Sequence, residues 1–274
     1  MDVNFTKMHV AGNDFMVVDW PADVALPGRE LIRSWADRRF GVGFDQLLVL
    51  LPPSAADVDC DYRIFNADGS EVEQCGNGAR CIAQRVAAAA GKTAVRLGSP
   101  AGIVAARLLG NGDVTIDLGV PRFEPSASLV AGLGRADRYR LTLGGREVEF
   151  GAVSLGNPHV VIAVDSVDEA PVGILGTAFQ DDPSFPRGVN VGFMQVLAPT
   201  RIRLRVFERG VGETPACGTG AAAAVAVGRS WGLLEARVGV ELPGGTLGVE
   251  WQGDGESIWL SGLTTVVFEG HISI

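Results

Sequence analysis

Lysine is scarce in this sequence, which contains only Lys7 and Lys92 among its 274 residues. Lysine and arginine together number 23, against 32 aspartates and glutamates, so the formal net charge is −9. A protein that binds nucleic acid needs a basic surface to neutralise phosphates. The charge balance therefore argues against a nucleic-acid partner.

Long apolar segments and an export signal are also missing. No run of about 18 apolar residues occurs, and residues 1–4 do not begin a basic stretch followed by an apolar one. We therefore expect a cytoplasmic protein with no membrane partner. The four cysteines are too few for a disulfide scaffold in a chain of this length, so we expect them to be reduced.

Glycine is abundant, at 37 of 274 residues, and tight turns separate short segments that alternate apolar and polar side chains. Such segments predict strands joined by hairpins. Helices are expected at residues 79–90 and 220–231, and both are apolar around most of their circumference. A helix of this kind is usually enclosed. The predicted fold class is α/β (α+β type), with a mixed, mainly antiparallel sheet wrapped around a central apolar helix in each of two pseudo-symmetric domains.

The two domains are inferred from an internal repeat. Residues 12–18 resemble 156–162 at an offset of 144 (156 − 12), and residues 75–79 resemble 217–221 at an offset of 142 (217 − 75). The order of the similar blocks is preserved, and a loop easily absorbs a two-residue difference. The expected domains are residues 1–122 and 123–263, with a last strand, 264–274, that returns to the first domain.

Each repeat carries a Cys-Gly-X-Gly sequence where its helix begins, at Cys75 and Cys217. Glycines allow a ligand to approach the backbone, and the free N–H groups of a helix N-terminus bind anions. The same positive helix end lowers the pKa of a cysteine, so we expect some thiolate at both positions at neutral pH. A single copy would be typical of a buried packing cysteine, whereas two matching copies favour a function for both thiols.

A pair of thiols related by pseudo-symmetry can invert a tetrahedral carbon. One thiol removes a proton and the other delivers a proton to the opposite face, as in a racemase or epimerase. Helix N-terminal amides would stabilise the carbanion that develops next to a carboxylate. Pyridoxal phosphate chemistry needs a Schiff-base lysine, and neither lysine lies in the repeat, so no cofactor is expected.

Other cysteine chemistries fit the pattern less well. Structural zinc prefers cysteine pairs two to four residues apart, so no metal is expected. A cysteine hydrolase could use His159 as its base, but this leaves the second Cys-Gly-X-Gly unexplained. A redox pair would be expected to show Cys-X-X-Cys. A non-catalytic metabolite-binding protein of the same fold stays open, although binding alone would not need the thiols.

Two long segments, 65–81 and 208–220, resemble the two signature sequences of the diaminopimelate epimerase family. Further motifs of that family fall at residues 12–15, 45–46, 156–159 and 189–191. The resemblance implies a cofactor-independent, metal-free isomerase that interconverts LL- and meso-diaminopimelate in lysine and peptidoglycan precursor biosynthesis. The nearest rival is a proline or hydroxyproline racemase, which is expected to have His in place of Asn77 and Asp-Arg-Ser after Phe207. A homodimer is one candidate assembly, and the sequence does not set the oligomeric state.

The resemblance also implies roles by position. Cys75 and Cys217 are the acid/base pair, and His159 and Glu208 are auxiliary acid/base residues near the thiols. Arg209 is expected to bind a substrate carboxylate through two hydrogen bonds. Gly192 departs from the family, in which an acidic residue is common at this position. The remaining substrate-binding residues are Asn13, Gln46, Asn66, Gly76, Asn77, Asn157, Asn190, Gly218 and Thr219.

Overall fold

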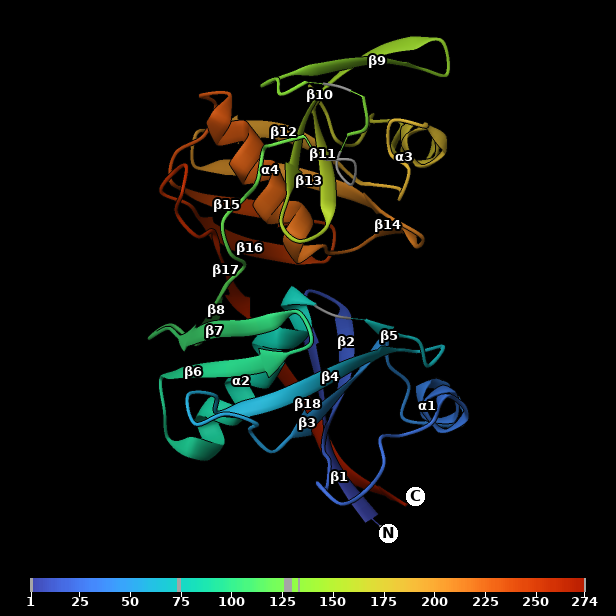
Figure 1. The fold of residues 1–274 in the computed structure, drawn as a ribbon, viewed down its shortest axis with the longest axis vertical. Coiled ribbons are helices and arrows are strands. Elements are labelled where there is room, and N and C mark those ends of the chain that lie inside the picture. Colours follow the sequence, from blue (N-terminus) through green and yellow to red (C-terminus); the bar gives the residue numbers. More distant parts are fainter. Residues whose placement is uncertain (1, 73–74, 126–129, 133, 274) are drawn as a thin grey trace. The chain divides into compact units, whose positions relative to one another are not determined.

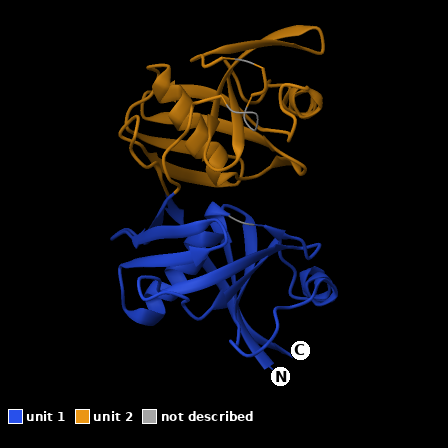
Figure 2. Cartoon of the chain, in the orientation of Figure 1, with its two compact units in different colours: residues 1–117, 261–274 blue, residues 118–260 orange. Residues whose placement is uncertain are grey.

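The computed structural model describes residues 2–72, 75–125, 130–132 and 134–273 (Figure 1). The chain forms two compact units, residues 1–117 with 261–274 and residues 118–260 (Figure 2). Glu73 and Gln74 of the first signature, and Ile274 of the predicted last strand, lie outside the described residues. Within the described part, no helix is long and apolar enough to cross a membrane.

Unit 1, residues 1–117 with 261–274, is built on six neighbouring strands. Antiparallel and parallel pairings alternate along the six, and the first and last pairings are antiparallel. These strands are, in spatial order, β1 (Asp2–Val10), β2 (Asn13–Asp19), β3 (Gln46–Leu51), β4 (Cys60–Asn66), β6 (Ala94–Ser99) and β7 (Gly102–Leu108). Further antiparallel pairings join β18 (Thr265–Ser273) to β1, β5 (Glu71–Val72) to β4, and β8 (Asp113–Asp117) to β7. The end of the chain thus belongs to the first unit.

Unit 2, residues 118–260, repeats the same series of pairings. Its six strands are β10 (Arg146–Ser154), β11 (Pro158–Ala163), β12 (Asn190–Ala198), β13 (Arg201–Glu208), β15 (Arg237–Leu242) and β16 (Gly245–Glu250). Additional antiparallel pairings add β9 (Tyr139–Leu143) to β10 and β14 (Gly212–Thr214) to β13. One further strand, β17 (Trp259–Leu263), crosses the boundary between the units. Two chain halves with little identical sequence therefore share one topology.

Each unit packs one apolar helix against its sheet and a second helix against the opposite face. In unit 1 these are α2 (Gly76–Ala90) and α1 (Arg29–Ala36), and in unit 2 they are α4 (Gly218–Ser230) and α3 (Val172–Asp181). Because β2 and β3 are covered on both faces, four consecutive residues of each are buried. Every residue of α4 from Gly220 to Gly228 is buried. The predicted fold class, with mainly antiparallel sheets around apolar central helices, is confirmed.

Candidate active site

In each unit the polar residues singled out by the sequence gather where the central helix begins. Gly12 and Gly156 have φ of +85° and +93°, a conformation that favours glycine, and they turn the chain into β2 and β11. Asn13 and Asn157 follow directly. Strand register then places Gln46 opposite Asn66 in unit 1 and Asn190 opposite His159 in unit 2; these pairs lie at the same end of the sheet as the turns.

Cys75 and Cys217 are the N-cap residues of α2 and α4. Both have extended backbones, with φ, ψ of −143°, 112° and −122°, 110°. A Cβ on Gly78 would lie 2.9 Å from Leu48 Cδ2, and one on Gly220 would lie 3.0 Å from Val206 Cγ2. The second glycine of each motif therefore lets the first helical turn approach the sheet. The amides of the first helical residues, Gly76 and Asn77 or Gly218 and Thr219, have no intrahelical acceptor.

Two sets of side-chain hydrogen bonds order the unit 1 residues. Asn77 Nδ2 donates to Asn13 Oδ1 at 3.2 Å, and Asn13 Nδ2 donates to Asp45 Oδ2 at 3.1 Å. Gln46 Nε2 donates to Asn66 Oδ1 at 3.0 Å. The other amide atom of Gln46, Oε1, is buried and has no hydrogen-bond partner among the described residues. This acceptor is available to a ligand that carries N–H groups.

Sequence reasoning missed the charged cluster that holds Asp45 in place. Arg38 binds both Asp14 and Asp45, with Nη2 at 2.7 Å and 2.9 Å from their Oδ1 atoms, and Lys7 also pairs with Asp14. Hydrogen bonds from Arg38 and Lys7 hold the pKa of Asp14 well below its usual range, despite the opposing effect of burial. The signal was present, because Asp14 and Asp45 adjoin Asn13 and Gln46 in the motifs.

In unit 2 a second chain of hydrogen bonds runs from His159 toward Cys217. His159 Nε2 lies 3.0 Å from Asn157 Oδ1, Asn157 Nδ2 donates to Thr219 Oγ1 at 3.3 Å, and Thr219 Oγ1 lies 3.7 Å from Cys217 Sγ. An amide oxygen only accepts, so Nε2 carries the proton and Nδ1 is left with a lone pair. Burial, with a smaller effect of Arg209, lowers the pKa of His159 to about 3. The imidazole is therefore neutral at physiological pH.

Asn190 and Arg209 are joined at the edge of the same cluster. Asn190 is buried; its Nδ2 donates to Pro158 O at 3.0 Å, and its Oδ1 accepts from the Arg209 amide at 3.0 Å. Arg209 itself is exposed, and its Nη1 donates to Arg187 O at 3.2 Å. The Arg209 guanidinium thus keeps donors that a carboxylate can accept.

One expectation for the thiols is wrong. The helix N-terminus was expected to lower the pKa of both cysteines, but burial and the nearby Glu208 carboxylate raise the pKa of Cys217 well above its ordinary value. Cys217 is 5% exposed. Loss of solvation and a like charge both disfavour the thiolate, and here they outweigh the helix field. Cys217 is therefore protonated at rest.

Comparison with known proteins gives the family. A sequence profile of the diaminopimelate epimerase family matches residues 5–124 and 151–267. The chain is 50% identical over 278 aligned residues to the diaminopimelate epimerase of Alkalilimnicola ehrlichii and 49% identical over 276 to that of Nitrosomonas europaea, with both chains fully covered in each case. This chain belongs to the diaminopimelate epimerase family. The resemblance drawn from its motifs is confirmed.

Solved structures outside the diaminopimelate epimerase family share the fold. A hydroxyproline epimerase from Agrobacterium vitis matches with a TM-score of 0.68 at 17% identity, covering 99% of this chain and 92% of that one. A PhzF-family phenazine biosynthesis protein from Bacillus anthracis matches with a TM-score of 0.69 at 19% identity, with full coverage of both. At these identities the likeness shows the architecture alone.

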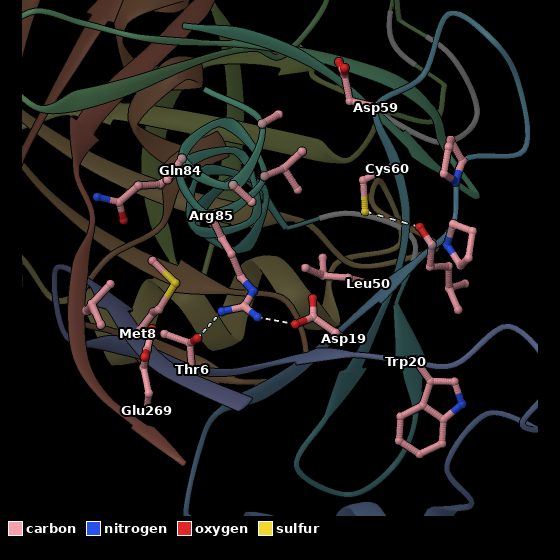
Figure 3. A pocket seen from close by; sticks show the side chains of 18 residues that line it. Thr6, Met8, Asp19, Trp20, Leu50, Asp59, Cys60, Gln84, Arg85 and Glu269 are labelled. Atoms are coloured by element: carbon pink, nitrogen blue, oxygen red, sulfur yellow. Dashed lines mark hydrogen bonds and ion pairs between the residues drawn. The ribbon is translucent and has the colours of Figure 1, made fainter. Parts of the chain in front are cut away.

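A cavity of about 820 Å³ opens elsewhere in unit 1 of this diaminopimelate epimerase family member (Figure 3). It is lined by the second half of α2, from Gln84 to Ala90, and by residues of β1, β3 and β18. Gln84 is nine residues, or about 13 Å of helix, beyond Cys75. The cavity therefore contains none of the motif residues. In the described part of the chain, no three His, Cys, Asp or Glu side chains are grouped as a metal site would require.

Proposed function

We propose that this chain interconverts LL- and meso-diaminopimelate, in the cytoplasm, as a step of lysine and peptidoglycan precursor biosynthesis. The observation that carries the proposal is the pair of cysteines, each at the N-cap of an apolar helix in one of two units of matching topology. Membership of the diaminopimelate epimerase family supports the same reaction. The reaction needs no bound cofactor, because the two thiols supply both the base and the acid.

In this proposal the thiolate of one cysteine takes the α-proton, and the thiol of the other gives its proton to the opposite face. The electron pair of the broken C–H bond is delocalised into the adjacent carboxylate and then forms the new C–H bond. After one turnover the two sulfurs have exchanged protonation states. Helix N-terminal amides stabilise the developing charge, and we assign this role to the backbone of Gly76, Asn77, Gly218 and Thr219.

The remaining groups would recognise the parts of the substrate that do not react. Arg209 suits the distal carboxylate, since guanidinium binds carboxylate through two parallel hydrogen bonds. Gln46 Oε1 suits a substrate ammonium, because this buried acceptor has no partner among the described residues. We assign His159 and Glu208 as auxiliary acid/base residues, and Asn13, Asn66, Asn157 and Asn190 as further substrate contacts.

Incubation of LL-diaminopimelate with the protein in D2O tests the function. In the first turnovers we expect deuterium at one α-carbon together with conversion of LL to meso isomer. Mass spectrometry and chiral chromatography measure the label and the isomers. L-proline and trans-4-hydroxy-L-proline serve as comparison substrates and should stay unlabelled. Exchange of proline without exchange of diaminopimelate would favour the rival racemase, and exchange of neither would favour a binding protein.

We also propose that two copies of the chain form a homodimer through β18. Four apolar side chains on or beside this strand are 47–60% exposed, namely Leu263, Val266, Val267 and Phe268. Val266 also lines the cavity of Figure 3, so a second copy over β18 would cover both surfaces. A charge at Phe268 should separate the copies. Sedimentation velocity of the parent chain and of Phe268→Glu tests this, and a parent that sediments as a monomer would refute it.

A further inference from the structure

Arg80 is a fully buried cation on α2, five residues after Cys75. Its Nη2 donates to Asn77 Oδ1 at 2.7 Å. Its other two nitrogens, Nε and Nη1, are buried and have no hydrogen-bond partner among the described residues. An isolated buried charge is costly, so a compensating negative charge is expected nearby.

Few groups can supply that charge. Burial lowers the pKa of Arg80 to about 10, so it stays protonated at neutral pH, and negative charge on Cys81, Cys75 or Asp113 of β8 opposes this effect. Burial raises the pKa of Cys81 far above its ordinary value, so Cys81 is a neutral thiol. The phenol of Tyr62 on β4, which also interacts with Cys75, is neutral because burial raises its pKa to about 12.

Besides the Asp113 carboxylate, Cys75 is the remaining group of this set that can carry a negative charge near Arg80. Its sulfur accepts a hydrogen bond from the Gly78 amide at 3.4 Å, at the positive end of α2. Both the amide and the helix end favour the thiolate over the thiol. The Arg80 guanidinium, which lacks partners for two of its nitrogens among the described residues, is a third positive group that favours the Cys75 thiolate.

We propose that Arg80 is a positioning residue of the unit 1 half-site, which holds Cys75 as the thiolate and fixes the orientation of Asn77. The proposal rests on the function given above. A guanidinium only donates, so its bond to Asn77 makes Oδ1 the acceptor and directs Nδ2 to Asn13. Asn13 in turn must direct its own Nδ2 to Asp45. One buried arginine therefore sets the orientation of two proposed substrate contacts.

The second half-site lacks this arginine. At the repeat offset of 142, position 80 corresponds to Ala222 of α4 (80 + 142), which is fully buried. Unit 2 instead brings Glu208 to its cysteine. A cation beside one thiol and an anion beside the other make Cys75 the resting base and Cys217 the resting acid. The resting enzyme is thereby prepared for the stereoisomer whose α-proton faces Cys75.

The test is the pH dependence of Cys75 alkylation by iodoacetamide, resolved from the other cysteines by peptide mapping. It compares Arg80→Met, which removes the charge, with Arg80→Lys, which keeps it. The control is Arg85→Met on the same helix, because Arg85 pairs with Asp19 and Thr6 at the cavity (Figure 3). Methionine fills a similar volume without the desolvation cost of a charge, so the variant should fold.

We expect Arg80→Met to slow alkylation of Cys75 at pH 7 by roughly tenfold, because an adjacent cation lowers a pKa by about 1 or more. Arg80→Lys should keep the parent alkylation profile, because it keeps the positive charge. It should raise KM for diaminopimelate, because it loses the planar guanidinium that orients the Asn77 side chain. Arg85→Met should match the parent in both. An unchanged profile in Arg80→Met, or an equal shift in Arg85→Met, would overturn the proposal. Alkylation does not depend on turnover, so failure of the proposed function would appear separately, as absent deuterium exchange in the parent chain.

Discussion

The two half-sites share a scaffold and differ in the charges placed on it. Both cysteines cap a helix beside a close-packed glycine, and the strands behind them pair in the same series. Unit 1 adds the buried cation Arg80, whereas unit 2 adds Glu208, whose charge disfavours the Cys217 thiolate. A repeated backbone thus supplies two equivalent cysteine positions, while single side chains place opposite charges in the two half-sites.

Removing either thiol should reduce the rate of epimerisation more than any other change considered below. Cys75→Ser and Cys217→Ser are each expected to reduce epimerisation by about 10²–10⁴-fold, because serine is a far weaker base at neutral pH. Steady-state kinetics in both substrate directions provides the measurement. Elimination from a β-halogenated analogue needs one base only. Each variant should therefore still catalyse elimination from the isomer whose α-proton faces the remaining cysteine. Full epimerisation by either variant would contradict the two-base proposal.

Arg209 tests a second difference between the half-sites, since its repeat position in unit 1 is Ala67 (209 − 142). Arg209→Lys keeps the charge but loses the two-pronged contact with a carboxylate. A lost charged hydrogen bond of about 1–3 kcal/mol corresponds to a KM that is roughly 10–100-fold higher, with kcat less affected. A lowered kcat with unchanged KM would instead place Arg209 near the reacting carbon.

Glu208→Gln should make the two half-sites more alike. Removing the carboxylate charge lowers the pKa of Cys217, although burial still raises it. We expect alkylation of Cys217 at pH 8 to become about tenfold faster, given the size of a like-charge effect. The matched control is Glu213→Gln on β14, a carboxylate that pairs with Arg205. Equally faster alkylation of Cys217 in both variants would show that unit 2 is destabilised in general, and that the charge of Glu208 is not the cause.

His159 predicts a pH dependence of stability. Its pKa is about 3 in the folded protein and about 6.5 in an unfolded chain. The unfolded state therefore binds the extra proton between these values, so stability is full above pH 6.5 and falls as the pH decreases toward 3. The slope from this residue is about 1.4 kcal/mol per pH unit. Urea unfolding at pH 4.5 to 7.5 should show a shallower slope in His159→Gln than in the parent.

The smallest effect is expected at Gly192, where the family resemblance predicted an acidic residue. A Cβ there would lie 3.4 Å from Leu204 Cδ1, an ordinary contact, and the backbone is extended within β12. Gly192→Ala should therefore change the free energy of unfolding by less than about 1 kcal/mol. Gly192→Asp should destabilise more, because its carboxylate would face apolar Leu204 and Val161. Denaturant titration of both variants gives the two values.

Most of the architecture could be predicted from periodicity. The apolar helices at 79–90 and 220–231 correspond to α2 and α4, and the alternating segment 201–207 corresponds to β13. The start of each helix was placed three or two residues late, because glycine is a poor helix former and the first turn is glycine-rich. The repeat blocks indicated which segments correspond, although they could not give the order of strands in the sheet.

Two repeats, each with a cysteine before a helix, could be recognised from residue type and spacing alone. The protonation of Cys217, the neutrality of His159 and the burial of Arg80 instead follow from how the folded chain packs. A pKa depends on solvent exclusion and on charges brought in from other elements, such as Glu208 at the end of β13. Spacing along the chain carries no measure of either quantity, and so the shared motif could not give the protonation of Cys217.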